Sequence, residues 1–137
     1  MEINGVAHVI LTVSNFEACY PFYKKLLTYF GMKPVIESEQ MLYCVGGRTA
    51  VGIMRCDDGY RAEKFVQQRV GLHHVCLRAR ERGHVDEVHG FLKTIGAKIV
   101  HPPEDGSWAP GYYSVLFEDP DGIRIEVNHV PGKGLLA

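Results

Sequence analysis

Two histidines in equivalent positions of a repeated pattern, and one glutamate near the end of the chain, are the residues best suited to chemistry. His8 lies in Gly-Val-Ala-His-Val-Ile-Leu (5–11), and His74 lies in Gly-Leu-His-His-Val-Cys-Leu (71–77). Glu126 lies in the middle of an expected strand (123–129), where a carboxylate is costly unless it is solvated, paired or bound to a metal. Two imidazoles and one carboxylate suit a divalent transition metal and leave coordination positions open for water, substrate or oxygen.

The two histidine segments open two copies of one pattern, which indicates an internal repeat. In each copy a helix is expected to follow and to end at a glycine, Gly31 or Gly96. One single-residue gap inside the helix is all that the alignment of the two copies needs. If the halves pair about a pseudo-twofold axis, His8 and His74 approach each other on one concave sheet, and Glu126 completes the cluster.

Periodicity and turn residues predict the order βαβββ in each half. We expect strands at about 5–13, 33–38, 41–46 and 49–55, and then at about 72–79, 98–101, 112–118 and 123–129. The first helix has a capping-box spacing at Ser14 and Glu17. Its regular part is expected to begin only at Pro21, because a proline inside a helix loses a hydrogen bond and clashes with the preceding turn. The second helix is expected over about 82–95.

Two segments of the second half are expected to be irregular. Residues 102–111 hold three prolines and two glycines, which favours a loop. Residues 119–122 (Asp-Pro-Asp-Gly) predict the turn of a hairpin.

Alternation along the strands sorts the candidate residues by face. Arg124, Glu126 and Asn128 share one face of the last strand, opposite the apolar residues that pack under the helices. Superposition on His8 selects His74 as the site histidine, and its neighbour His73 is then expected to lie toward the helix side.

The chain resembles the vicinal oxygen chelate superfamily, which includes glyoxalase I, methylmalonyl-CoA epimerase, extradiol dioxygenases, fosfomycin-resistance proteins and bleomycin-binding proteins. The resemblance covers nearly the whole chain and rests on Ala7-His8-Val9, on His74-Val75-Cys76 and, most specifically, on Phe117–Val127. It implies an α+β fold in which two paired βαβββ modules form a cupped mixed β-sheet with helices on the outer face. Residues 1–137 would form a single domain, with module one at about 5–56, a linker at about 57–70 and module two at about 71–130.

Carried over position by position, the resemblance implies that His8, His74 and Glu126 bind a divalent metal ion: Fe(II), Mn, Ni, Co or Zn. Glyoxalases add a fourth ligand from the last strand of the first module, but residues 41–56 contain no Asp, Glu, Gln, Asn or His. Extradiol enzymes use a further histidine ahead of the second ligand, and residues 57–72 contain none. Isomerisation, oxygen insertion and addition therefore all stay open as the reaction.

The resemblance implies a metal-dependent enzyme, either a glyoxalase-like lyase or isomerase or a dioxygenase, that acts on a small oxygenated substrate. The substrate would chelate the metal, which stabilises an enolate- or alkoxide-like anion. The alternative is a metal-free protein of the bleomycin-resistance type that sequesters a ligand, and a structural homodimer with a vestigial cup is a third option. Many relatives build their sites from two chains, so we expect a homodimer and leave open which chain supplies each ligand.

Four further residues are candidates for substrate binding. Tyr113, or its neighbour Tyr112, is expected to point into the cup. Trp108 and His101 flank the proline-rich loop, which could cover the site as a lid or be an ordinary surface loop. Arg124 shares the face of Glu126 and would bind an anionic group of the substrate or pair with a neighbouring acid.

Composition excludes several other classes of protein. The formal net charge is −1, and scattered Lys and Arg argue against a nucleic-acid partner. No apolar run approaches the length of a membrane span. The N-terminus lacks the features of a signal peptide, and the four cysteines form no C-x-x-C pair, so we expect a cytoplasmic protein with reduced thiols in its core.

Overall fold

The chain divides into two compact units, Met1–Lys64 and Phe65–Ala137, and the computed structural model describes it through residue 133. The boundary between the units falls inside the segment expected to be a linker. The first unit contains β1 (Val9–Val13), α1 (Phe16–Tyr29), β2 (Lys33–Glu37), β3 (Met41–Gly46), β4 (Thr49–Arg55) and a short 3-10 turn (Asp58–Tyr60). The second contains β5 (Val75–Arg78), α2 (Arg82–Thr94), β6 (Lys98–Asp105), β7 (Tyr113–Glu118) and β8 (Arg124–His129).

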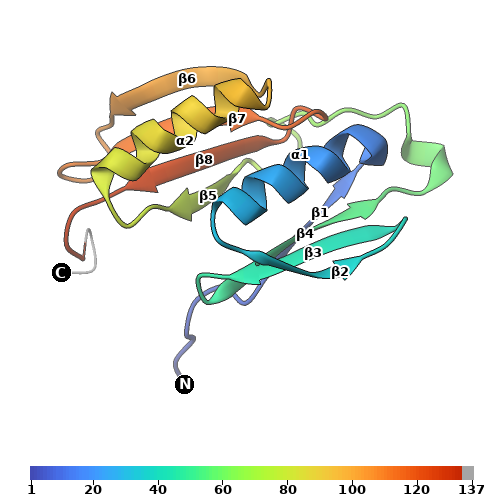
Figure 1. Ribbon diagram of the computed structural model, residues 1–137, viewed down its shortest axis with the longest axis horizontal. Helices are drawn as coiled ribbons and strands as arrows, with labels where there is room; N and C mark the ends of the chain where they lie inside the picture. The colour runs from blue at the N-terminus through green and yellow to red at the C-terminus, as the bar shows by residue number, and fades with distance from the viewer. Residues whose placement is uncertain (134–137) are drawn as a thin grey trace. The chain divides into compact units, whose positions relative to one another are not determined.

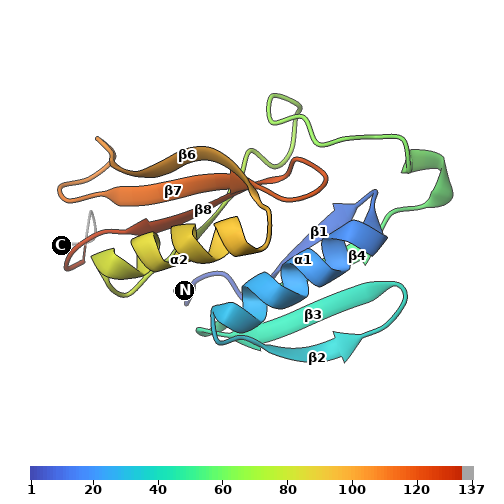
Figure 2. The ribbon, with the colours of Figure 1, turned by 45° about the horizontal axis from the view of Figure 1, so that its top comes forward.

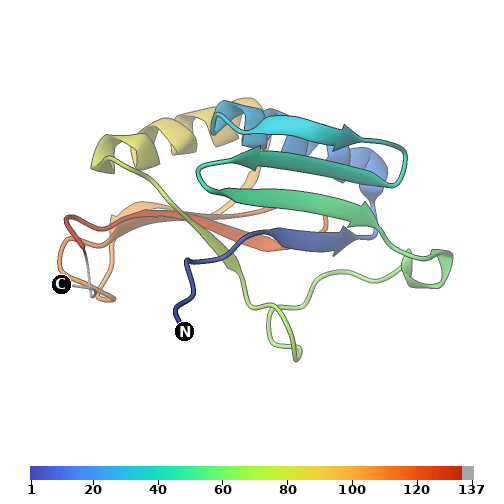
Figure 3. The same ribbon diagram turned by 90° about the horizontal axis from the view of Figure 1, so that it is seen from below.

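The two units repeat one topology. The first sheet has the strand order β1-β4-β3-β2, which Figure 3 shows side by side, and the second has the equivalent order β5-β8-β7-β6. In both sheets the first two strands are parallel and the other pairs are antiparallel. These observations confirm the α+β class and the repeated βαβββ order.

Each helix covers one face of the sheet in its own unit. Helix α1 packs on β2, β3 and β4 (Figure 1), and α2 packs on β6, β7 and β8 (Figure 2). The apolar side of α1 buries Phe16, Cys19, Phe22, Tyr23, Leu26 and Leu27. The buried residues of α2 are Val85, Val88 and Leu92, and the strands on which it packs bury Val115, Phe117, Ile125 and Val127. The burial of Ile125 and Val127 confirms the alternation predicted for the last strand.

The helices end in the same way, as the repeat predicted. Gly31 has a φ of +79° and Gly96 a φ of +68°, a left-handed conformation that costs a glycine little. The amide of each glycine donates to a carbonyl of the last turn, Thr28 or Lys93. The amide of the residue after each glycine donates to a carbonyl five residues earlier in the helix. The two helix ends therefore form the same Schellman-type hydrogen bonds.

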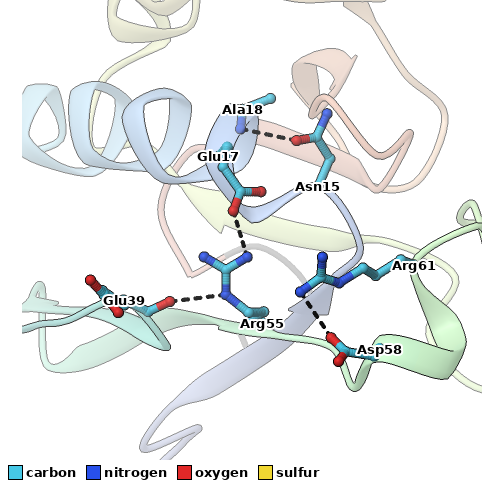
Figure 4. A network of polar contacts seen from close by, with 7 residues as sticks. All are labelled: Asn15, Glu17, Ala18, Glu39, Arg55, Asp58 and Arg61. Atoms are coloured by element: carbon cyan, nitrogen blue, oxygen red, sulfur yellow. Dashed lines mark hydrogen bonds and ion pairs between the residues drawn. The ribbon is translucent and has the colours of Figure 1, made fainter.

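The start of α1 differs from the expectation. Asn15 caps the helix, because its side-chain oxygen accepts a hydrogen bond of 3.2 Å from the amide of Ala18 (Figure 4), so the predicted capping residue Ser14 lies one position too early. The helix begins at Phe16 and continues through Pro21. A proline there removes only the bond to the carbonyl of Glu17, and both residues are exposed, so water can replace the missing partner.

Strand β6 is longer than predicted. It continues to Asp105 through Pro102 and Pro103, in the segment expected to be a loop. Because β6 is the edge strand of its sheet, prolines are tolerated there, and the pairing with β7 shifts register on both sides of His101.

The turn before β8 sets the register of the strand that carries Glu126. Asp119 is buried, and its side-chain oxygen accepts bonds of 2.8 Å from the amides of Asp121 and Ile123. Gly122 completes the turn with a φ of +85°, which confirms the hairpin predicted at 119–122. Neither helix within residues 1–133 has the length and hydropathy that crossing a membrane requires.

Candidate functional site

His74 and Glu126 lie together in the second unit. His74 directly precedes β5, and Glu126 is in the middle of β8, which pairs with β5 in parallel. The Nε2 atom of His74 is 3.2 Å from Oε2 of Glu126. The carboxylate is largely enclosed, with a side chain 12% exposed, while that of His74 is 34% exposed. The structure thus brings two of the three predicted ligands into contact.

A tyrosine holds the other oxygen of Glu126. Tyr112 directly precedes β7, and its hydroxyl donates a hydrogen bond to Oε1 of Glu126. Burial, together with this bond to a carboxylate, raises the pKa of the Tyr112 hydroxyl, so it stays protonated and remains a donor at neutral pH. Both oxygens of Glu126 are therefore engaged, and the carboxylate has a defined orientation.

Two more residues continue the network behind His74. The Nδ1 atoms of His73 and His74 are 2.7 Å apart, and Nε2 of Gln67 is 3.3 Å from Nδ1 of His73. The prediction that His73 faces the helix side is wrong. Strand β5 begins only at Val75, so the alternation of a regular strand does not apply to the two histidines.

These residues line a cavity of about 200 Å³ within the second unit. Its lining consists of Gln67, His73, His74, His101, Glu104, Asp105, Gly106, Trp108, Tyr112, Ser114, Leu116 and Glu126. Ser114 and Leu116 alternate with Tyr112 on one face of β7, and they pair with Asn128 and Glu126 of β8. The lining combines three histidines, three carboxylates and two aromatic rings, and it contains no Lys or Arg.

Two of the four predicted substrate-binding residues are part of this lining. Trp108 is 77% exposed, as a residue at an open rim would be. His101 lies on β6, with Nδ1 2.8 Å from the carbonyl oxygen of Pro102 and 3.5 Å from Oε1 of Glu104. Its Nδ1 therefore donates locally, which leaves Nε2 as the atom able to accept a hydrogen bond from a ligand.

The other two predicted substrate-binding residues lie elsewhere. Tyr113 turns to helix α2, where its hydroxyl donates to Asp86 at 2.7 Å and its ring lies 3.6 Å from the guanidinium carbon of Arg82. Tyr112, the alternative to Tyr113, directly precedes β7 and contacts Glu126 instead. Arg124 pairs with Glu118 across the β7–β8 ladder, its Nε 3.5 Å from Oε1, and it does not line the cavity.

Cys76 departs from the prediction that all the cysteines are core residues. Cys19, Cys44 and Cys56 are buried, but Cys76 is an exposed residue of β5, opposite Glu126 of β8. Neighbouring side chains nevertheless crowd its thiol, and this desolvation raises the pKa of Cys76 to about 12, with the Glu126 carboxylate adding to the rise. The thiol therefore stays protonated at neutral pH and is a poor nucleophile.

His8 occupies the equivalent place in the first unit. It directly precedes β1, as His74 directly precedes β5, so neither histidine is inside its strand as expected. His8 is exposed, and its ring meets that of Tyr43 edge-on at 6.3 Å between centroids. Nothing in the interval 1–133 gathers three or more His, Cys, Asp or Glu side chains into a group able to hold a metal ion.

The pair in the second unit fits two neighbouring ligands of one divalent ion. Ligand atoms roughly 2.1 Å from a metal are about 3.0–3.4 Å apart at angles between about 90° and 109°. The 3.2 Å between Nε2 of His74 and Oε2 of Glu126 lies within this interval. An imidazole nitrogen and a carboxylate oxygen are also donors that Fe, Mn, Co, Ni and Zn all accept.

Comparison with known proteins places both units in one family. The model of the Glyoxalase/Bleomycin resistance protein/Dioxygenase superfamily matches residues 5–127. The uncharacterized protein YqjT of Bacillus subtilis (strain 168) is 27% identical over 124 residues, which are 88% of this chain and 94% of that protein.

Solved structures agree in fold. A candidate glyoxalase from Bacillus halodurans superposes with a TM-score of 0.81 and 27% identity, over 93% of this chain and 96% of that one. Lactoylglutathione lyase from Agrobacterium tumefaciens superposes with a TM-score of 0.68 and 21% identity, over 94% and 96%. Since the family model spans most of both modules, the chain belongs to the Glyoxalase/Bleomycin resistance protein/Dioxygenase superfamily.

Proposed function

We propose that the protein is a metal-dependent enzyme of the glyoxalase or dioxygenase type that acts on a small oxygenated substrate. The observation that carries this proposal is the contact of 3.2 Å between Nε2 of His74 and Oε2 of Glu126 on the wall of a cavity. A histidine and a carboxylate held together at a cavity are a common basis of metal-dependent chemistry. His8, which occupies the equivalent position of the first module, is the proposed third ligand.

The residues around the pair have separate roles in this proposal. Glu126 would offset part of the charge of the metal, and the Tyr112 hydroxyl holds the carboxylate in place. A bound divalent metal would supply Lewis-acid stabilisation of an anion that develops on a substrate oxygen. Trp108 offers an exposed ring on which a planar group can stack, and Nε2 of His101 can accept a hydrogen bond.

The lining also favours one kind of substrate. It contains three carboxylates and no Lys or Arg, and Arg124 is paired with Glu118 outside it. A strongly anionic group would find no fixed cation on this wall apart from the metal. We therefore propose a neutral substrate, or one whose anionic oxygens bind the metal itself.

Three single variants test the proposal against its rival, a metal-free protein that sequesters a ligand. Protein purified without oxygen is analysed for bound metal, and oxygen uptake and thiol-adduct formation are then assayed on the metal-bound form. An enzyme of the proposed type loses metal and turnover in His8→Ala, His74→Ala and Glu126→Gln. The proposal is contradicted if the wild-type protein binds none of Fe(II), Mn, Co, Ni or Zn. It is also contradicted if all three variants keep the activity of the wild type.

The homodimer and the cytoplasmic location remain predictions of the sequence. Light scattering of the purified protein, with and without metal, tests the first, and cell fractionation tests the second.

A further inference from the structure

The hydrogen bonds behind His74 determine which of its ring nitrogens is free. The side-chain nitrogen of Gln67 can only donate, and it lies 3.3 Å from Nδ1 of His73. Nδ1 of His73 is therefore an acceptor, and a neutral His73 carries its proton on Nε2. The contact of 2.7 Å between the two Nδ1 atoms then requires that Nδ1–H of His74 donates to His73.

In a neutral His74, the form that binds metals, this assignment leaves a lone pair on Nε2 that faces Glu126. Nε2 of His74 and Oε2 of Glu126 are 3.2 Å apart, and a lone pair that faces a carboxylate oxygen at this distance is repelled unless a proton or a metal cation lies between them. Glu126 cannot turn away without losing the hydrogen bond that it accepts from Tyr112. With His74 neutral, the network holds two acceptors toward one point, and a metal cation can take the place of the proton there.

We propose that His73 is a positioning residue: it accepts the Nδ1 proton of His74 and so directs Nε2 of His74 to the cation shared with Glu126. The nature of that cation, a divalent metal, rests on the proposed function. Histidines that bind metals usually donate their other ring N–H to an acceptor of this kind, which sets the tautomer and the ring orientation. Here the acceptor is the preceding residue in the chain, and Gln67 fixes its tautomer in turn.

Zn²⁺ affinity, measured by competition with a chelator, tests the role of His73. We expect His73→Ala to bind Zn²⁺ about 10–100-fold more weakly than the wild type, because loss of an outer-shell partner typically costs that factor. His73→Asn places a side-chain oxygen near the position of Nδ1 and should restore the affinity to within about threefold of the wild type. His84→Ala, on the exposed side of α2 and outside the cavity, is the control and should leave the affinity unchanged.

Nitrogen-15 NMR of the histidine side chains gives a readout that packing alone would not move. In the Zn²⁺-loaded wild type and in His73→Asn, His74 should carry its proton on Nδ1, and that signal should shift or exchange rapidly in His73→Ala. A proton on Nε2 of His74, or an unchanged Zn²⁺ affinity of His73→Ala, overturns the inference. If His73→Ala does not fold, the wild-type tautomer and the affinity of His73→Asn decide.

The two proposals fail in different ways. Wild-type protein that binds no Zn²⁺ or other divalent transition metal contradicts the proposed function. The spectrum of the metal-free protein then still tests the inference, because His74 must carry a proton on Nδ1 whose signal responds to His73→Ala. A metal-binding wild type in which His73 has no effect contradicts the inference alone.

Discussion

At the scale of single residues, Tyr112 and Tyr113 are neighbours that serve opposite faces of the second sheet. Tyr112 donates to Glu126 at the cavity, and Tyr113 donates to Asp86 of α2. Tyr112→Phe should weaken divalent-metal binding about tenfold or more, because the carboxylate of Glu126, a proposed ligand, loses the hydrogen bond that orients it. Tyr113→Phe also removes a tyrosine hydroxyl, but on the other face of the sheet. It should leave the affinity for the metal within about twofold of the wild type. Chelator competition measures both, and equal losses would mean that Tyr112 acts through general stability.

An ion pair in the first unit has a defined pH dependence. A hydrogen bond of 2.6 Å from a guanidinium nitrogen of Arg55 to Oε1 of Glu17 lowers the pKa of the Glu17 carboxyl (Figure 4). Arg55 is held in place because it also donates to the carbonyl of Glu39 and stacks on the ring of Phe16. A lowered carboxyl pKa stabilises the fold above the usual Glu value of about 4.3, and this stabilisation is lost as the pH falls through the folded-state value.

A pH titration of Glu17, monitored by NMR, checks this dependence. Arg55→Gln should move the pKa of Glu17 up toward its usual value. Arg61→Gln is the control, because Arg61 pairs with Asp58 and has the smallest influence on Glu17 of the causes that lower its pKa. A larger shift in Arg61→Gln than in Arg55→Gln would contradict the assignment of the ion pair.

At the scale of elements, the helix ends are the clearest structural trace of the repeat. A side chain at Gly31 or Gly96 would meet no atom within 4 Å, so only the left-handed backbone opposes substitution. Gly31→Ala and Gly96→Ala should each lower the free energy of unfolding by about 1–2 kcal/mol. Gly90→Ala, in the interior of α2 and equally open, should raise it by about 0.5–1 kcal/mol. Urea unfolding tests all three, and a Gly96→Ala protein as stable as Gly90→Ala would refute the argument.

The elements also show how far the sequence alone could lead. Turns and apolar periods located most strands within one or two residues, because local backbone preference and the repeat point to the same boundaries. Pro21 inside α1 and the prolines of β6 could not be placed in this way. Pro21 is tolerated because it lies on the exposed face of α1, and the prolines of β6 are tolerated because β6 is an edge strand. Both conditions depend on the folded unit and cannot be read from the local sequence.

The candidate site was predictable to a similar extent. The repeat and the family ending predict His74 and Glu126 as neighbouring site residues, and the structure places their side chains in contact. The face predicted for His73 is wrong, because the strand begins after this residue. Gln67 had no recognisable signal, since nothing in a polar linker indicates which side chain folds back onto a histidine. The sequence signal for Tyr112 is weak: it alternates with residues that pair with the strand of Glu126.

At the scale of the whole molecule, the proposed ligand set takes residues from both compact units, whereas the cavity and the His74–Glu126 contact belong to the second. A metal that binds only the folded chain stabilises it by an amount that grows with metal concentration, about 2.7 kcal/mol at 100 times the Kd. If His8 is a ligand, its removal must reduce this stabilisation even though His8 lies outside the second unit.

Chemical unfolding at several concentrations of Zn²⁺ therefore tests the ligand set as a whole. In the wild type and in His84→Ala, the free energy of unfolding should rise by about 1.4 kcal/mol for each tenfold increase of Zn²⁺ above the Kd, and a chelator should abolish the rise. In His8→Ala the rise should begin only at much higher Zn²⁺, because one donor is missing. If His8→Ala follows the wild-type curve, His8 is not a ligand, and the metal is held by the second unit without it. If no protein responds to any divalent transition metal, the cavity must serve a ligand that needs none, which is the behaviour of a sequestering member of the family.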